Sequence, residues 1–185
     1  VVIAENQGGK LRYKTIDSCL VFLPMIHGKQ LITVENLADS NSLHHVQQEM
    51  VNHNGSQCGY CTPGIVMSLF GLYKNHHNPS REVIEDSLTG NLCRCTGYQP
   101  IIKAAEHVCS KADADKFKLH EAKICALLDE INRDRSPIEI ETATQKYYKP
   151  LKLADALAFR NKFPCELIIS GATDSALRQT KNHEV

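Results

Sequence analysis

The stretch that decides the fold runs from Gln57 to Pro100. It opens with QCGYCTPG at positions 57–64 and closes with GNLCRCTGYQP at positions 90–100. The two segments carry one C-x2-C and one C-x-C motif, whose four cysteines are Cys58, Cys61, Cys93 and Cys95. Four thiols gathered in this way predict a metal or iron–sulfur site.

The second cysteine pair separates the candidate kinds of site. A C-x2-C pair alone also occurs in zinc sites and in thioredoxin-like redox sites. Structural zinc favours two to four residues between cysteines on both sides, whereas only Arg94 separates the second pair here. A rhombic Fe2S2 core shares its four ligands between two irons and accommodates the tighter loop. The spacing therefore favours a [2Fe-2S] cluster, with zinc and a pair of disulfides as the alternatives.

The composition limits the kinds of partner that the chain is expected to bind. The 185 residues include 21 Lys and Arg against 21 Asp and Glu, so the formal net charge is zero. This balance predicts no nucleic-acid partner and no anionic membrane partner. No apolar run approaches the roughly 20 residues that span a bilayer. Eight cysteines without a secretion signal favour ligands or free thiols and predict a cytoplasmic location.

The hydrophobic pattern predicts an α+β chain. Strands are expected at 1–5, 10–15 and 30–35, with a turn at Gly8-Gly9. Four short helices should follow and form a bundle. The first should begin at an N-cap at Ser42 and have Leu43, Val46 and Met50 on one face. The second should begin at an N-cap at Thr62, the third should run from Ser80 to Gly90, and the fourth from Pro100 to Val108. The helix starts at 62–64 and 96–98 supply backbone N–H groups, except at Pro63, that can donate to cluster sulfurs. The two cysteine motifs therefore fall in loops between the helices.

The rest of the chain is expected to leave the bundle. Helical spacing recurs at 118–131, and 133–145 is expected to be linker or extended chain. A helix at 151–162, a strand at 167–170 and a turn at Gly171 then predict the beginning of an α/β domain. The chain begins inside an expected strand and without Met, so we expect it to be a piece of a longer protein.

The two cysteine motifs and the residues around them resemble those of a known protein family. QCGYCTPGIVMSL (57–69) followed by LTGNLCRCTGYQPII (88–102) resembles the [2Fe-2S]-binding helical domain of the xanthine dehydrogenase/aldehyde oxidase family of molybdenum hydroxylases. The resemblance implies one cluster held by the four cysteines, near a molybdopterin carried by a separate large subunit or domain. It also implies that Gln57 and Cys95 lie close to the pterin.

Residues upstream of the bundle resemble the end of a plant-type ferredoxin domain. From the sequence alone, Cys19 beside an apolar segment is an ordinary small core residue. The resemblance instead implies that Cys19 is the fourth ligand of a second [2Fe-2S] cluster, whose other three ligands should precede Val1. Cys109, Cys125 and Cys165 have no ligand spacing and are expected to be structural.

The C-terminal run, YYKPLKLADALAFRNKFPCELIISGATDSALRQTK (147–181), resembles the beginning of the family's FAD-binding domain. A glycine turn between a strand and a helix can place backbone amides around a phosphate. The resemblance implies that four consecutive residues contact the FAD pyrophosphate: Gly171, Ala172, Thr173 and Asp174.

Together these expectations give four segments. Residues 1–41 would end a ferredoxin-like domain, 42–112 form the helical [2Fe-2S] domain, 113–144 a linker, and 145–185 begin the FAD-binding domain. The resemblance implies an oxidoreductase of the xanthine dehydrogenase type, most similar to a bacterial small subunit, that passes electrons from purine hydroxylation through [2Fe-2S] clusters to FAD and NAD+. An aldehyde or N-heterocycle as substrate is the alternative within the family, and a zinc-binding docking module is the alternative outside it. None of the residues is expected to be catalytic.

Overall fold

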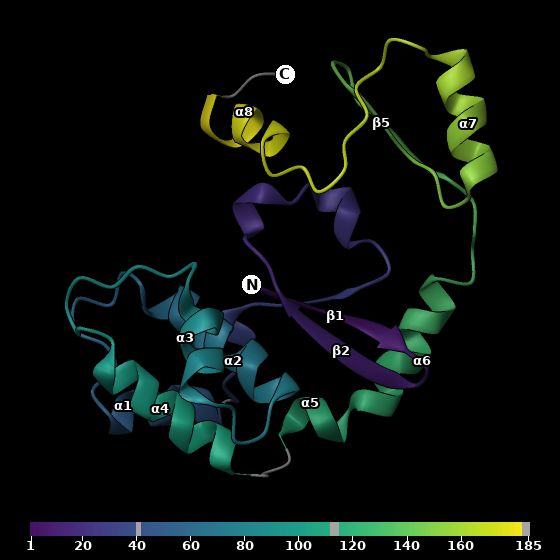
Figure 1. Cartoon of the computed structure of the whole chain (residues 1–185). Coiled ribbons are helices and arrows are strands. Elements are labelled where there is room, and N and C mark those ends of the chain that lie inside the picture. Colours follow the sequence, from purple (N-terminus) through teal and green to yellow (C-terminus); the bar gives the residue numbers. More distant parts are fainter. Residues whose placement is uncertain (40–41, 112–114, 183–185) are drawn as a thin grey trace. The chain divides into compact units, whose positions relative to one another are not determined.

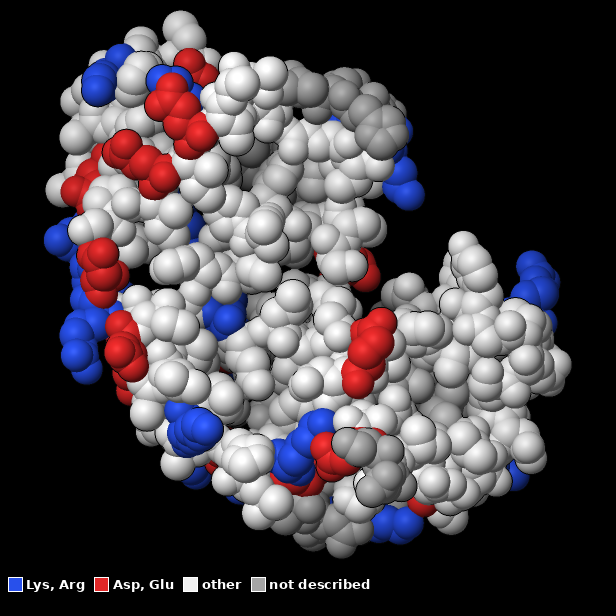
Figure 2. All heavy atoms as spheres, turned by 180° about the vertical axis from the view of Figure 1, so that it is seen from behind, with Lys and Arg blue, Asp and Glu red and all other residues white. Residues whose placement is uncertain are grey.

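The protein is described from a computed structural model that covers residues 1–39, 42–111 and 115–182 (Figure 1). It divides into two compact units. The first comprises Val1–Ile16 and Lys29–Ala126, and the second comprises Asp17–Gly28 and Leu127–Val185. Over the described residues, no helix combines the length and the apolar character needed to cross a membrane. Acidic and basic side chains are interspersed on the face shown in Figure 2.

A three-stranded antiparallel sheet opens the first unit. Its order is β2 (Lys10–Thr15), β1 (Val2–Gln7), β3 (Gln30–Ile32). Gly8 and Gly9 make the tight turn between β1 and β2, and both have a positive φ that favours glycine. The three expected strands are therefore confirmed, although the third ends at Ile32 and a 3-10 turn, η3 (Val34–Asn36), follows it.

Four helices follow the sheet, α1 (His45–Asn52), α2 (Thr62–Asn75), α3 (Arg81–Leu88) and α4 (Gln99–Ser110). Helix α2 contacts the other three helices and also β1 and β2. Eight consecutive residues of α2, from 65 to 72, are buried, which places this helix at the centre of the unit. Gly71 lies so close to Thr15 of β2 that a Cβ atom would overlap the threonine hydroxyl. A larger residue there would force the Thr15 side chain to move.

Two predicted helix starts were wrong. Ser42 is not the N-cap of α1, because it forms an isolated bridge with Asp39. His44 caps α1 instead, with its Nδ1 accepting from the N–H of Val46 at 3.2 Å. Leu43 therefore lies outside the helix and is half exposed. At α2 the N-cap is Cys61, and the hydroxyl of Thr62 hydrogen-bonds to that of Ser56 at 2.6 Å rather than capping the helix.

The segment expected to be a linker, 113–144, contains regular structure. Helices α5 (Lys116–Leu119) and α6 (Glu121–Ile131) occupy its first half. Strand β4 (Ile138–Glu141) then pairs in antiparallel fashion with β5 (Lys146–Lys149). The helical spacing predicted at 118–131 is thus confirmed, whereas the extended chain after it forms a hairpin. The proposed domain boundaries remain predictions, and residues 112–114 lie outside the described part.

The second unit contains the 3-10 turns η1 (Ser18–Leu20) and η2 (Leu23–Ile26), the β4–β5 hairpin, α7 (Leu153–Lys162) and α8 (Ser175–Asn182). Helix α7 forms where predicted, and Phe159 stacks on Tyr148 of β5 with ring centroids 3.9 Å apart. The strand predicted at 167–170 was wrong, because no described strand pairs with this segment. A lone strand leaves its backbone groups without a ladder, and Leu167 is 74 % exposed.

A buried ionic cluster joins α1, α2 and α5 within the first unit. The Asp115 carboxylate accepts from Lys74 Nζ at 2.9 Å and contacts His44 Nε2 at 3.1 Å. The side chains of Asp115 and Lys74 are 2 % and 8 % exposed. Burial by itself would raise the pKa of Asp115, but the hydrogen bonds from His44 and Lys74 outweigh it and hold that pKa below its usual range. The carboxylate is therefore ionised in the fold.

We expect Asp115→Asn to lower the free energy of unfolding by about 3 kcal/mol, because it leaves the Lys74 ammonium buried without a counter-ion. The native pKa of Asp115 lies below its unfolded value, so its contribution is present above about pH 4 and is lost as the pH falls further. Urea unfolding of both proteins between pH 7 and pH 3 measures this, and the difference should shrink toward pH 3. Glu85→Gln, in the exposed pair with Arg81, serves as the control and should cost about 0.5 kcal/mol or less. An equal effect of both substitutions would contradict the prediction.

Candidate metal centre

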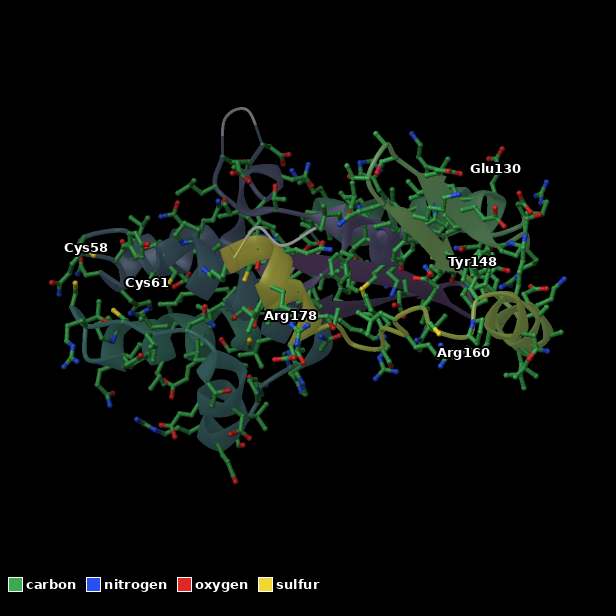
Figure 3. All side chains as sticks on the ribbon, turned by 90° about the horizontal axis from the view of Figure 1, so that it is seen from above. Cys58, Cys61, Glu130, Tyr148, Arg160 and Arg178 are labelled. Atoms are coloured by element: carbon green, nitrogen blue, oxygen red, sulfur yellow. The ribbon has the colours of Figure 1, made fainter. Side chains whose placement is uncertain are left out.

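The four cysteines of the two motifs come from two loops of the first unit. Cys58 and Cys61 lie in the loop between α1 and α2, and Figure 3 shows both at the entry to α2. Cys93 and Cys95 lie in the loop between α3 and α4. A sulfur of the first loop, Cys58 Sγ, meets a sulfur of the second, Cys95 Sγ, so the fold brings the two motifs together.

The sulfur atoms form two pairs. Cys58 Sγ and Cys95 Sγ are 3.6 Å apart, and the Cys61 and Cys93 thiols lie near enough for each to shift the pKa of the other. Each pair therefore takes one sulfur from each loop. Among the described residues, no three of the four sulfurs lie within 4.8 Å of one another. The four sulfurs are thus arranged as two close pairs and not as one compact group.

This arrangement distinguishes the kinds of metal that the site can hold. Tetrahedral zinc with bonds of about 2.3 Å places all its sulfurs about 3.8 Å apart. A binuclear iron core instead takes two sulfurs on each iron and separates the two sets. The close Cys58–Cys95 pair, with no third sulfur of a described residue within 4.8 Å of both, agrees with the second requirement.

Backbone and hydroxyl donors point at the sulfurs. The Thr96 hydroxyl lies 3.1 Å from Cys93 Sγ, and this contact, with the N–H groups of Thr96 and Cys95, lowers the pKa of Cys93 to about 7. The N–H of Tyr60 likewise lowers the pKa of Cys58. Burial raises the pKa of Cys61, and the hydrogen bond to Cys58 raises that of Cys95. Each pair thus contains one thiol disposed to ionise, which is the state that binds metal.

Side chains around the C-x-C loop hold it in place, and the sequence analysis did not identify them. The Tyr98 hydroxyl accepts from the N–H of Cys93 at 2.8 Å and donates to the carbonyl of Asn91 at 3.1 Å. Asn91 Nδ2 donates to Ser68 Oγ on α2 at 2.7 Å. A Cβ on Gly64 would lie 2.8 Å from Asn91 Oδ1, so a glycine is needed there. The positive φ of Tyr98, 67°, turns its backbone into α4. A single sequence carries no signal for such contacts between loops.

Exposed apolar side chains occur on both loops. Tyr60 and Leu92 are 95 % and 86 % exposed, although both side chains are large. A groove of about 550 Å³ lies next to the C-x2-C loop, and its lining includes Leu43, Met50, Val51 and Pro63. Leu92, on the other loop, does not line this groove. Exposed apolar surface at the edge of a site often marks contact with another protein or domain.

Two further predicted site residues are Cys19, in the second unit, and Gln57, beside the cysteine site. Cys19 is exposed in η1 of the second unit, and its role as a ligand stays a prediction. Gln57 is exposed next to Cys58, and its proximity to a pterin also stays a prediction. Cys109 and Cys125 are buried, as expected of structural cysteines, whereas Cys165 is exposed.

The predicted FAD contacts immediately precede α8. Gly171 and Ala172 have φ values of 73° and 64°, so two successive residues adopt the left-handed conformation. Such a conformation is uncommon for alanine and is often held at a functional turn. Ala172 is buried and its carbonyl accepts from the N–H of Ala176 at 2.7 Å, whereas Thr173 and Asp174 are exposed. The assignment of this turn to FAD stays a prediction.

Known proteins resemble this chain over the same region. Residues 33–106 match the family described as "[2Fe-2S] binding domain". The chain is 51 % identical over 108 residues to a xanthine dehydrogenase of Blastobotrys adeninivorans, and the aligned region covers 57 % of this chain and 8 % of that protein. It is 36 % identical over 166 residues to aldehyde oxidase 1 of Cavia porcellus, which covers 87 % of this chain and 12 % of that protein.

A solved structure supports the fold. The aldehyde oxidoreductase of Desulfovibrio gigas superposes with a TM-score of 0.50 at 22 % identity, covering 76 % of this chain and 19 % of that one. The chain therefore spans about a tenth of the length of these curated relatives and a fifth of the solved protein. The motifs, the matched [2Fe-2S] domain, and the similarity to both a xanthine dehydrogenase and an aldehyde oxidase all indicate the same family. This chain belongs to the xanthine dehydrogenase/aldehyde oxidase family of molybdenum hydroxylases.

Proposed function

We propose that Cys58, Cys61, Cys93 and Cys95 hold one [2Fe-2S] cluster. The observation that carries the proposal is the arrangement of the sulfurs in two close pairs, Cys58 with Cys95 and Cys61 with Cys93. Each pair would bind one iron, so each iron would be held by both loops. A cluster held there supplies one-electron transfer.

The protein contributes position and charge stabilisation at this site. Both loops are attached to α2, the C-x2-C loop directly and the C-x-C loop through the Asn91–Ser68 hydrogen bond. The donors from Thr96 and from the Tyr60 N–H reduce the energy of negative charge on the sulfurs. The exposure of Cys58 and Cys95 leaves one side of the site open to a partner.

We further propose that the chain is the electron-transfer portion of a xanthine dehydrogenase-type molybdo-flavoenzyme. In that assignment electrons released by purine hydroxylation at a molybdopterin centre reach FAD and NAD+ through this portion of the protein. The 51 % identity to a xanthine dehydrogenase favours purine over an aldehyde or another heterocycle as the substrate. We expect the intact protein to be cytoplasmic, and a bacterial-type small subunit remains the predicted form.

The partner that covers the two loops would be the molybdopterin-binding subunit or domain. The exposed Tyr60 and Leu92, and the apolar groove next to the C-x2-C loop, support this placement. Gln57 would then face the pterin. Cys19, with ligands that precede Val1, would hold the second cluster, and residues 171–174 would contact the FAD pyrophosphate.

We expect the anaerobically purified protein to carry about two iron and two acid-labile sulfide per chain and to be red-brown. Cys93→Ser and Cys58→Ala should each lose most of the iron and colour, because each substitution removes one of the two cysteine ligands to an iron. Cys165→Ser, an exposed cysteine of the second unit, is the matched control and should keep both. Metal analysis with the visible spectrum makes the measurement. A colourless, well-folded protein that contains zinc in place of iron would overturn the assignment.

The electron-transfer role is tested separately in the intact enzyme. Cys58→Ala should leave purine binding unchanged, because this chain contributes no substrate pocket in the proposal, while purine-dependent reduction of NAD+ falls to background. Purine binding by equilibrium titration and turnover by NADH absorbance give the two readouts. Turnover at the wild-type rate, in a variant shown to lack this cluster, would exclude the electron-transfer role.

Tyr98→Phe tests the support of the C-x-C loop. It removes the hydrogen bonds to the Cys93 N–H and the Asn91 carbonyl, so we expect the free energy of unfolding to fall by about 1–2 kcal/mol. Iron should also pass to a chelator several-fold faster than from the unsubstituted protein. Tyr60→Phe is the control, because its side chain is almost fully exposed at the same site. Equal rates of iron loss in the two variants would show that the Tyr98 hydroxyl does not support the loop.

A further inference from the structure

A second group of metal-binding side chains lies in the first unit, apart from the four cysteines. Glu49 belongs to α1, His53 caps the C-terminus of α1, and His107 belongs to α4. The two helices contact one another and lie side by side in Figure 1. One ligand atom from each of the three side chains lies within 4.8 Å of the other two. Among the described residues, no other group of three or more His, Cys, Asp or Glu meets this condition.

The spacing along the chain explains how the group forms. Glu49 and His53 are four residues apart and therefore share one face at the end of α1. His107 reaches the same point from the last part of α4, and its ring centroid is 4.4 Å from that of His53. The site thus takes two ligands from one helix end and one from its neighbour.

The distances between the ligand atoms suit a metal ion. Glu49 Oε2 is 3.3 Å from His53 Nε2 and 3.8 Å from His107 Nδ1. Tetrahedral zinc with bonds of about 2.0–2.1 Å places neighbouring nitrogen and oxygen ligands about 3.3 Å apart. Small side-chain rotations would therefore bring all three atoms into one coordination shell.

The carboxylate is already oriented for this task. Lys111 Nζ binds Glu49 Oε1 at 2.8 Å, and Asn52 Nδ2 donates to the same oxygen at 3.4 Å. The other oxygen, Oε2, is the one that faces both imidazoles. The Glu49 side chain is only 8 % exposed, and its burial alone would raise its pKa. The hydrogen bond from Lys111 is the main cause that lowers this pKa instead. A carboxylate held ionised by an outer partner is the usual arrangement around a metal ligand.

One side of the group is open. The His107 side chain is 58 % exposed and that of His53 is 20 % exposed, whereas Glu49 is buried beneath them. A metal ion can therefore enter from solvent, and water can complete its coordination. Two imidazoles and one carboxylate are ligands preferred by zinc and by other late first-row divalent ions.

We propose that Glu49, His53 and His107 form a divalent transition-metal site, with Zn²⁺ as the expected occupant. Glu49 Oε2 and one ring nitrogen of each histidine are the protein ligands. Because the ligands come from α1 and α4, the bound ion links the ends of two helices that pack in the helical part of the first unit. The competing interpretation is a set of ordinary hydrogen-bonded ion pairs around a buried glutamate.

Zinc binding is measured by isothermal titration on the protein loaded with iron and sulfide, with the visible spectrum recorded throughout. An unchanged spectrum shows that zinc does not displace iron from the cysteines. We expect one zinc per chain, and a midpoint of thermal unfolding that rises with zinc concentration, because a ligand that binds only the native state stabilises it.

Two ligand variants and one control complete the test. Glu49→Gln and His107→Ala should each weaken zinc binding at least about tenfold, since loss of even an outer partner typically costs 10–100-fold, and should abolish the zinc-dependent rise in unfolding temperature. His107 is largely exposed, so its substitution leaves the fold intact. His76→Ala, at an exposed histidine outside the group, should bind like the unsubstituted protein. Zinc affinity that is equal in all four proteins, or that is absent in all, would overturn the proposal.

The test remains decisive if the cysteines hold zinc instead of a cluster. The unsubstituted protein would then bind two zinc ions and His107→Ala only one. The count for the histidine site therefore comes from the difference between these two proteins. Failure of the cluster proposal and failure of the histidine-site proposal give different results.

Discussion

The burial of α2 is the constraint on which the rest of the first unit depends. Eight successive residues of this helix are inaccessible, and it touches β1, β2 and the three other helices. A helix buried all round has its position determined by every neighbour. Its first turn follows directly from Cys61, so the packing of the core also determines where two of the four sulfurs lie.

The second cysteine loop is positioned by polar contacts and not by burial. Asn91 connects this loop to Ser68 of α2, and Tyr98 connects both ends of the loop to one another. Gly64 leaves the space that Asn91 occupies. These contacts preorganise the C-x-C loop, and ligands that are already in place bind a metal with less loss of conformational freedom.

The site also shows how the protein combines a stable interior with an open reactive end. The Asp115–Lys74–His44 cluster lies deep in the first unit, where each charge is paired and hydrogen-bonded. The cysteine loops, by contrast, expose Cys58, Cys95 and the apolar Tyr60 and Leu92. In the proposed electron-transfer role, such an open end would let a partner's redox centre come close to the sulfurs. The exposed apolar side chains of these loops are unusual for a surface in water, but they would suit a surface that a partner covers.

The sequence by itself located the two cysteine motifs and predicted the chemistry of the main site. The C-x2-C and C-x-C spacing indicated four ligands and favoured two irons, and the periodic apolar residues located α2, α3, α4, α6 and α7, because both signals are local in the chain. Only the tertiary structure decided which sulfurs pair, that His44 and not Ser42 caps α1, and that residues 167–170 form no strand. These outcomes depend on partners distant in sequence: Cys58 meets Cys95, the His44 ring is held by Asp115, and a strand needs a neighbour. The approach of His107 to Glu49 has the same origin, since 58 residues separate them and only the packing of α4 on α1 joins them.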